Sequence, residues 1–143
     1  MILDHNYNPL RIHHVGIIMP DMEQAKRFME KFGMPEDYTS YVPNYQANCI
    51  YLKSGDGSVI ELIIPDGGAL KAFNRGHGGL HHIAIEVDDI VETQRFFETN
   101  QMELLENEPV DCDSGILINF LQLRFGEGVM VEFVQRKTDG EVV

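Results

Sequence analysis

The apolar positions of this chain follow a strand-like pattern and then a helical pattern, and this pair of patterns occurs twice. Residues 12–19 and 80–87 are nearly continuous apolar runs of strand length. Each run is followed by a segment in which apolar side chains recur every three to four residues, as on one face of a helix. The helical stripes consist of Met22, Ala25, Phe28, Met29 and Phe32, and of Ile90, Thr93, Phe96 and Phe97. The chain therefore predicts a strand followed by an amphipathic helix, twice.

Capping residues bound both predicted helices. Asp21 and Asp89 each stand directly before an apolar stripe, with a Gln or Glu three residues later, as in an N-terminal capping box. Gly33 is expected to end the first helix, because glycine readily adopts the left-handed conformation that closes helices. Asn100 is expected to end the second helix.

Three shorter strands complete each half. They are predicted over residues 38–42, 47–53 and 58–64 in the first half, and over 103–106, 116–123 and 129–135 in the second. The sequence thus predicts one α+β domain over residues 11–135, built from two βαβββ modules, 11–64 and 79–135. A linker, 65–78, joins them and carries a short helix over 69–74, while 1–10 and 136–143 are expected to be loose termini.

The two halves also resemble each other residue by residue. When residues 12–34 are placed over 80–102, eight of the 23 pairs are identical, including both histidines of the His-His pairs. Further along, GDGSVIELI from Gly55 resembles GEGVMVEFV from Gly126. Two matches in the same order indicate an internal duplication.

Composition narrows the function classes. The chain has 143 residues and a formal net charge of −12, which argues against nucleic acid and anionic membrane surfaces as partners. It has no apolar run long enough to span a membrane, and no signal peptide is visible. Its two cysteines form no CxxC motif. A cytoplasmic protein with reduced thiols is expected.

Strand alternation selects one histidine of each pair as a candidate ligand. Neighbouring side chains in a strand point to opposite faces. His14 shares its face with Gly16, and His82 shares its face with Ala84, so small residues leave room beside each imidazole. These two histidines are expected to point into an open, concave side of the sheet.

The same alternation assigns His13 and His81 to the opposite face. That face carries the continuously apolar positions of each strand, which are expected to pack under the helices. His13 and His81 are therefore expected at the edge of the helix-packed layer, and His13→Ala is expected to leave metal binding largely intact.

Two carboxylates occur inside otherwise apolar strands, Glu61 in SVIELII and Glu132 in GVMVEFV. A buried charge is costly unless it is paired or bound to a metal. The duplication makes the two positions equivalent, so one His and one Glu from each module would meet where the modules face each other. Imidazole and carboxylate together suit a divalent Co, Ni, Zn, Mn or Fe ion. The alternative is that the His-His pairs are duplicated surface residues.

These residues also carry a resemblance. Over nearly all of residues 11–135 the chain resembles the vicinal oxygen chelate (glyoxalase) superfamily. LKAFNRGHGGLHHIAIEVDDI, residues 70–90, and GVMVEF, residues 128–133, are most similar to the methylmalonyl-CoA epimerase family. The resemblance implies a cupped mixed sheet around a metal, dimers, and metal ligands at His14, Glu61, His82 and Glu132.

The resemblance further implies a metal-dependent epimerase or isomerase that removes a proton α to a carbonyl, with a small-molecule substrate such as an acyl-CoA. Glu132 is the first choice as base and Glu61 its partner, while the substrate-binding residues stay open. The alternatives are a glyoxalase I-type lactoylglutathione lyase, a non-catalytic binding or resistance protein, and an extradiol dioxygenase. Gln122-Leu123-Arg124 stands where such epimerases carry His-Pro-Lys, which weakens the expectation of CoA binding.

Overall fold

The protein is described here by a computed structural model, which places residues 11–137. The first module contains β1 (Arg11–Ile18), α1 (Met22–Phe32), β2 (Glu36–Val42), β3 (Ala47–Leu52) and β4 (Ile60–Pro65). The second contains β5 (Gly79–Glu86), α3 (Ile90–Thr99), β6 (Val110–Cys112), β7 (Ile116–Phe120) and β8 (Val131–Arg136). Between them lies α2 (Gly68–Ala72), followed by a 3-10 turn over Phe73–Gly76. Both predicted modules are therefore present.

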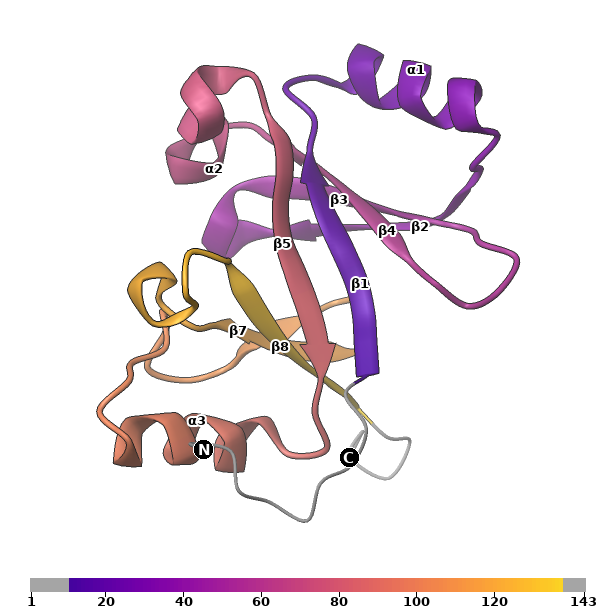
Figure 1. Ribbon diagram of the computed structural model, residues 1–143. Coiled ribbons are helices and arrows are strands. Elements are labelled where there is room, and N and C mark those ends of the chain that lie inside the picture. The colour runs from indigo at the N-terminus through magenta and orange to yellow at the C-terminus, as the bar shows by residue number, and fades with distance from the viewer. Residues whose placement is uncertain (1–10, 138–143) are drawn as a thin grey trace.

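All eight strands form one sheet in the order β2-β3-β4-β1-β5-β8-β7-β6. β1 pairs parallel with β4 in the first module, and β5 pairs parallel with β8 in the second. The modules join where β1 and β5 run antiparallel at the centre, with α1 near one end of this pair and α3 near the other (Figure 1). This mixed, curved sheet confirms the predicted α+β class, and the duplicated sequence corresponds to a duplicated arrangement.

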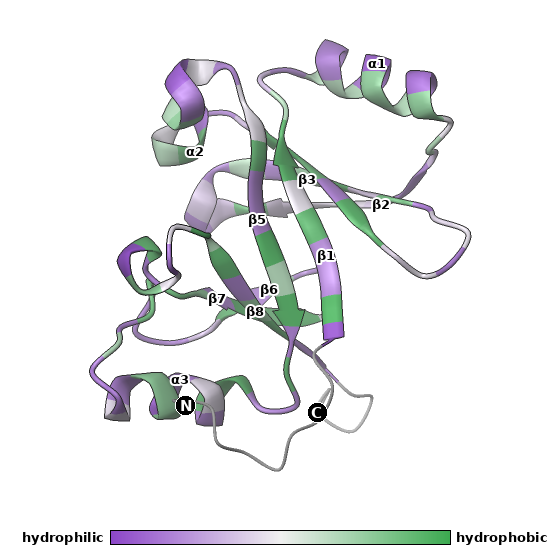
Figure 2. Ribbon diagram, viewed as in Figure 1, coloured by the Kyte–Doolittle hydropathy of each residue, from purple (hydrophilic) through white to green (hydrophobic). Residues whose placement is uncertain are grey.

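The helices α1 and α3 cover one face of the sheet. Ala25 of α1 is fully buried and packs in a cluster with Ile50, Leu52 and Leu62 of β3 and β4. A second cluster forms under α3 around Ile90, Leu104, Leu121 and Phe133. Apolar and polar residues alternate around both helices, and the strands are mostly apolar (Figure 2). The apolar periodicity therefore identified the helix-packed layer correctly.

The predicted helix starts are confirmed. The Asp21 carboxylate accepts a hydrogen bond from the Gln24 backbone N–H at 2.8 Å, and Asp89 accepts one from Glu92 at 3.1 Å. Gly33 closes α1 with φ 63°, as expected. α3 ends at Asn100, as predicted, but it is Gln101 that takes the left-handed conformation, with φ 61°.

The strand predicted over 103–106 is wrong. That segment makes only an isolated bridge, Leu104 to Leu121, and the short strand β6 follows it. The reason is Asn119 of β7, which is fully buried. Its side chain accepts a hydrogen bond from the Glu106 N–H and donates one to the Glu106 carbonyl, each at 3.0 Å. Backbone hydrogen bonds still join the Leu105 N–H to the Phe120 carbonyl and the Gln122 N–H to the Glu103 carbonyl, but at Glu106 the Asn119 side chain takes the place of a further ladder bond.

Other element ends differ more modestly. The last strand of each module starts two residues later than predicted, at Ile60 and at Val131, and β8 extends to Arg136. The helix predicted over 69–74 breaks at Phe73, because Asn74 and Arg75 adopt left-handed conformations with φ 53° and 56°. The termini predicted to be loose, 1–10 and most of 136–143, lie outside the described residues.

Candidate active site and metal centre

The first His-His pair lies at a β-bulge. In the antiparallel pairing of β1 with β5, Ile12 faces Ile85 and His14 faces Ala84. His13 lies between them without a partner, so two residues of β1 oppose one position of β5. Such a bulge interrupts the alternation of side chains along a strand and re-aims one of them.

The second pair repeats the irregularity on the other strand. Leu80 of β5 faces Ile17 and His82 faces Gly16, which leaves His81 as the additional residue. The duplication has therefore reproduced a bulge in each module, and both bulges fall on the first histidine of the pair.

The bulges overturn the expected positions of His13 and His81. Both histidines lie on the concave side of the sheet instead of the helix-packed side. His13 is buried, and the charges of Glu132 and Arg136 affect its pKa. These two residues share the concave face of β8. The His81 ring lies edge-on to Phe73 at 5.1 Å and lines the cavity in this face. Regular alternation predicted the wrong face because it assumes an unbroken strand pairing.

His14 and His82 do lie where the alternation placed them. Gly16 of β1 stands between Glu61 on β4 and His82 on β5 in the pairing of these three strands. A Cβ atom at Gly16 would lie 2.2 Å from Cε1 of His82, so only glycine leaves space for this ring. A small residue does make room for an imidazole, but Gly16 makes it for His82 of the neighbouring strand, whereas the sequence predicted room beside His14 on the same strand.

The second module has the same arrangement, with Ala84 in the place of Gly16. Ala84 of β5 stands between His14 on β1 and Glu132 on β8. Ala84 is fully buried. Gly16 and Ala84 are therefore each flanked by an imidazole and a carboxylate on the neighbouring strands. The four polar side chains converge above the centre of the sheet.

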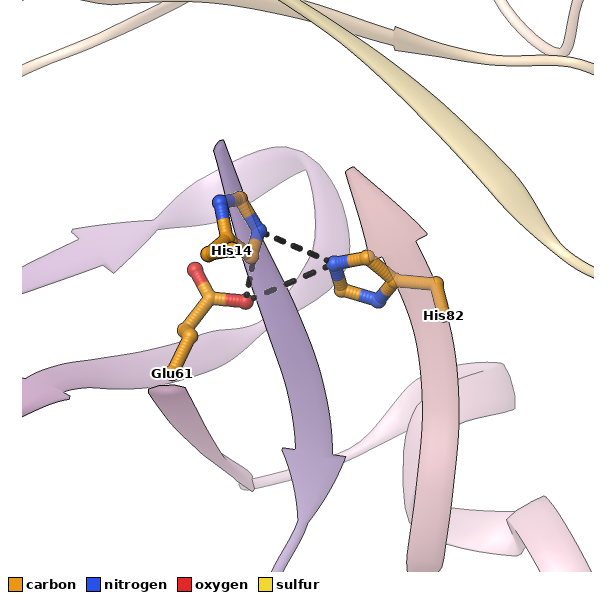
Figure 3. Close-up of side chains that lie close together, drawn as sticks. All are labelled: His14, Glu61 and His82. Carbon is orange, nitrogen blue, oxygen red and sulfur yellow. Dashed lines mark hydrogen bonds and ion pairs between the residues drawn. The ribbon is translucent and has the colours of Figure 1, made fainter. Parts of the chain in front are cut away.

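The polar atoms of these side chains meet at one point. His14 Nε2 lies 2.9 Å from Glu132 Oε1 and 3.5 Å from Glu61 Oε1. His82 Nε2 lies 3.4 Å and 3.6 Å from the same two oxygens, and the two Nε2 atoms are 3.1 Å apart. Figure 3 shows His14, His82 and Glu61 directed toward one another. All four predicted site residues are brought together.

This geometry fits a metal ion. Ligand atoms about 2.0–2.2 Å from a common ion lie roughly 3–3.5 Å apart when they are adjacent. The ligand atoms of His14, Glu61 and His82 all lie within 4.8 Å of one another, and Glu132 adds an oxygen 2.9 Å from His14. Glu132 Oε1 is buried and has no donor with hydrogen-bond geometry. Two imidazoles and two carboxylates form a donor set for a transition metal.

The electrostatics of the cluster reflect this close approach. Burial alone would lower the pKa of His14, but the carboxylates of Glu61 and Glu132 raise it above its usual value. Burial alone would raise the pKa of Glu132, but His82 and His14 hold it below its usual value. Burial, reinforced by the adjacent histidine, lowers the pKa of His13 and of His81 to about 4. His13 and His81 are therefore neutral at pH 7.

Two aromatic residues frame the cluster, and the sequence reasoning missed them. Tyr51 of β3 pairs with Glu61, and Phe120 of β7 pairs with Glu132. The Tyr51 ring lies edge-on to His14 at 5.9 Å, and the Phe120 ring lies edge-on to His82 at 5.2 Å. The two aromatic residues occupy equivalent positions in the modules, each opposite a glutamate, so the repeat could have identified them.

The cluster lies at the wall of a cavity of about 340 Å³. Apart from Glu61, Glu132 and the histidines, most of its lining side chains are apolar or aromatic, and they come from both modules and from α2. Cys49 and Cys112 also line it, and burial raises the pKa of each thiol. These thiols are therefore poor nucleophiles at neutral pH.

Comparison with known proteins assigns the chain to a superfamily. The model of the Glyoxalase/Bleomycin resistance protein/Dioxygenase superfamily matches residues 13–120. The chain belongs to this superfamily. The resemblance drawn from the sequence is thereby confirmed, and the matched range includes His13, His14, Glu61, His81 and His82.

Several curated relatives are epimerases. The ethylmalonyl-CoA/methylmalonyl-CoA epimerase of Cereibacter sphaeroides is 30% identical over 135 residues, which cover 87% of this chain and 97% of the relative. The human mitochondrial methylmalonyl-CoA epimerase is 28% identical over 134 residues, covering 90% and 76% respectively. These relatives are enzymes.

Solved structures agree. A Streptomyces coelicolor methylmalonyl-CoA epimerase variant in complex with 2-nitronate-propionyl-CoA has a TM-score of 0.77 and 25% identity, covering 90% of this chain and 98% of its own. A second methylmalonyl-CoA epimerase structure has a TM-score of 0.77 and 28% identity, covering 93% of this chain and 100% of its own.

Among residues 11–137, no helix is long and apolar enough to cross a membrane.

Proposed function

We propose that this protein is a metal-dependent epimerase or isomerase that removes a proton from the carbon next to a substrate carbonyl. The observation that carries the proposal is the convergence of two imidazoles and two carboxylates on one point of an otherwise largely apolar cavity. The epimerases among the relatives support this reaction class over other chemistries of the superfamily.

His14, Glu61, His82 and Glu132 would hold a divalent transition metal. Bound beside the substrate, such an ion would stabilise the negative charge that develops on the carbonyl oxygen as the adjacent C–H bond loses its proton. The four side chains are each no more than 6% exposed. Groups so shielded from solvent are stable only when they are paired or bound to a metal.

Glu132 is the proposed base. Its carboxylate is ionised at neutral pH, because His82 and His14 hold its pKa low. It accepts the α-proton at a carboxylate oxygen, and the conjugate acid can return a proton to the same carbon. Glu61 enters the cluster from the other module, so it is the partner for proton transfer on the opposite face. Both glutamates therefore have a dual role, as ligand and as acid or base.

A methylmalonyl-CoA-like thioester is the best single candidate for the substrate. The structure related at 25% identity holds an acyl-CoA analogue, and the apolar cavity wall suits a short acyl group. Two cationic side chains that could contact the CoA phosphates, Lys71 and Arg124, already have other partners. Lys71 donates a hydrogen bond to the Pro20 carbonyl at 3.0 Å, and Arg124 lies 3.6 Å from Glu103. A docked CoA would have to compete for these groups.

A glyoxalase I-type lyase is the second candidate. One observation favours it: position 61 carries a glutamate directed at both histidines. Together with Glu132, it gives the cluster two carboxylates. Such an enzyme converts a hemithioacetal to a thiol ester by the same proton abstraction.

The deciding experiment follows the α-proton by NMR in D₂O. The metal-loaded protein is incubated with methylmalonyl-CoA and, separately, with a methylglyoxal–thiol adduct. Deuterium entering only the thioester supports the epimerase, and product from only the adduct supports the lyase. Glu23→Gln, at an exposed carboxylate of α1 that does not line the cavity, serves as the control variant. Exchange with neither substrate would contradict both candidates.

A further inference from the structure

Each proposed ligand histidine contacts the histidine that precedes it in the chain. His13 Nδ1 lies 2.7 Å from His14 Nδ1, and the two rings meet edge to face at 79°. His81 Nδ1 lies 2.8 Å from His82 Nδ1, and these rings meet at 88°. The same contact, between the same atoms, is therefore made independently in both modules.

The distance requires one nitrogen of each pair to donate and the other to accept. A neutral imidazole carries one N–H and one lone pair, so the partner of its Nδ1 determines where the proton sits. His14 directs Nε2 toward Glu132 and toward His82 Nε2. Nε2 is consequently the atom that must offer its lone pair to an ion, which leaves the ring proton on Nδ1.

We propose that His13 and His81 are positioning residues that accept a hydrogen bond from Nδ1–H of His14 and His82, and thereby hold Nε2 of each ligand deprotonated and directed at the metal. This inference rests on the proposed metal site. Ligand histidines generally donate their second ring N–H to an acceptor, which is most often a carboxylate or a carbonyl. Here a second imidazole takes that place, and its own proton lies on Nε2.

The β-bulges make this contact possible. In an unbroken strand, His13 would point away from His14 and toward the helices, and no hydrogen bond between the rings could form. The missing partner of His13 in the β1–β5 pairing brings its ring to the concave side, and the same is true of His81. The bulges therefore have a definite consequence for the metal site.

The surroundings hold the accepting rings in place. His13 is 7% exposed and its ring packs edge to face against His14, which is 1% exposed. His81 is packed edge-on against Phe73 at 5.1 Å and Phe120 at 6.2 Å. Because His81 also lines the cavity, replacing it would disturb substrate contacts as well. His13 is not among the lining residues, so it is the better position for a test.

Two replacements of His13 separate hydrogen bonding from packing. His13→Phe keeps an aromatic ring but removes the acceptor. His13→Asn places an amide oxygen near the position of Nδ1 and restores an acceptor. We expect the zinc affinity of His13→Phe to fall about 10- to 100-fold, the usual effect of losing a partner of a ligand histidine. We expect His13→Asn to recover most of that loss, and exposed His77→Phe to bind zinc as the wild type does.

The direct readout is ¹⁵N NMR of the histidine rings in the zinc-loaded wild type. We expect His13 to carry its proton on Nε2, and a ¹⁵N–¹⁵N coupling across the hydrogen bond to connect the Nδ1 atoms of His13 and His14. That coupling should be absent in His13→Phe. A purely structural role of His13 would not produce it.

The outcomes separate this inference from the proposed function. A proton on Nδ1 of His13, or unchanged zinc affinity in His13→Phe, would overturn the positioning role even if the enzyme is active. Zinc binding with the expected coupling, but without α-proton exchange, would overturn the proposed reaction and leave the positioning role intact. Failure of the wild type to bind zinc would overturn both.

Discussion

Gly16 and His82 form the closest fit in the site. The residues face each other across the β1–β5 pairing, and the imidazole of His82 lies over the position where a Cβ atom of residue 16 would be. Such an atom would be 2.2 Å from Cε1 and 2.7 Å from Nε2, far inside van der Waals contact. The absence of a side chain at Gly16 is therefore what allows His82 to reach the cluster.

Replacement of Gly16 should consequently damage the metal site. In Gly16→Ala we expect the His82 ring to be displaced, metal affinity to fall at least about 10-fold, and the free energy of unfolding to drop by about 1–3 kcal/mol from overpacking. Calorimetric titration with Co²⁺ and urea unfolding measure the two effects. Gly55→Ala is the matched control, because a Cβ there would have no neighbour within 4 Å. Equal metal binding by both variants would contradict the argument.

Glu132→Gln should separate metal binding from proton transfer. The amide keeps the shape of the side chain and an oxygen donor, but it cannot accept the α-proton. We expect the rate of deuterium incorporation to fall at least about 100-fold, which is typical of the loss of a general base. Metal content, measured by elemental analysis of the same samples, should fall much less. A variant that retains the wild-type exchange rate would remove Glu132 from the catalytic role.

Metal binding should also stabilise the fold. Without an ion, the cluster brings two buried carboxylates close to two imidazoles, and Glu132 Oε1 has no hydrogen-bond donor. At a free metal concentration of 100 times Kd, we expect the free energy of unfolding to rise by about 2.7 kcal/mol. Thermal unfolding with added Co²⁺, and again after chelation, measures this gain. His14→Ala should abolish it, and a gain of equal size in that variant would argue for a different site.

Asn119 should be important for stability although it is polar and belongs to neither apolar cluster under the helices. Its side chain bonds the Glu106 N–H, the Glu106 carbonyl, the Phe120 N–H and Gln94. Asn119→Ala would leave buried backbone groups unpaired, and we expect a loss of about 2–4 kcal/mol in urea unfolding. Exposed Asn44→Ala, the control, should change little. A loss below about 0.5 kcal/mol at Asn119 would mean that water replaces these bonds.

The capping aspartates offer a test of the duplicated helix starts. Asp21→Ala removes the acceptor for the Gln24 N–H, and we expect the free energy of unfolding to fall by about 1 kcal/mol. Asp21→Asn keeps an acceptor and should be nearly neutral. Asp89→Ala should behave like Asp21→Ala, since Asp89 accepts from Glu92 in the same way. Unequal losses at the two positions would show that packing, and not the cap, dominates at one of them.

Much of the fold could be predicted because its signals are local. Apolar periodicity and capping residues marked α1 and α3, and the repeat marked the two modules. The segment 103–106 was mistaken for a strand because the competing interaction, a buried Asn119 side chain bonding Glu106, lies 13 residues away in the chain. No local pattern indicates that contact. The helix break at Asn74 and Arg75 likewise depends on left-handed conformations that residue types other than glycine rarely adopt.

The sequence by itself determined which residues could form the site. The duplication and the isolated charges in apolar strands identified His14, Glu61, His82 and Glu132, and the structure brings their polar atoms within 2.9–3.6 Å in the His–Glu pairs. Only the tertiary structure decided on which face of the sheet His13 and His81 lie. Their orientation depends on the register between β1 and β5, which are far apart in the chain. Side-chain alternation is a property of one strand, whereas a bulge is a property of two paired strands, so no pattern within either strand could reveal it.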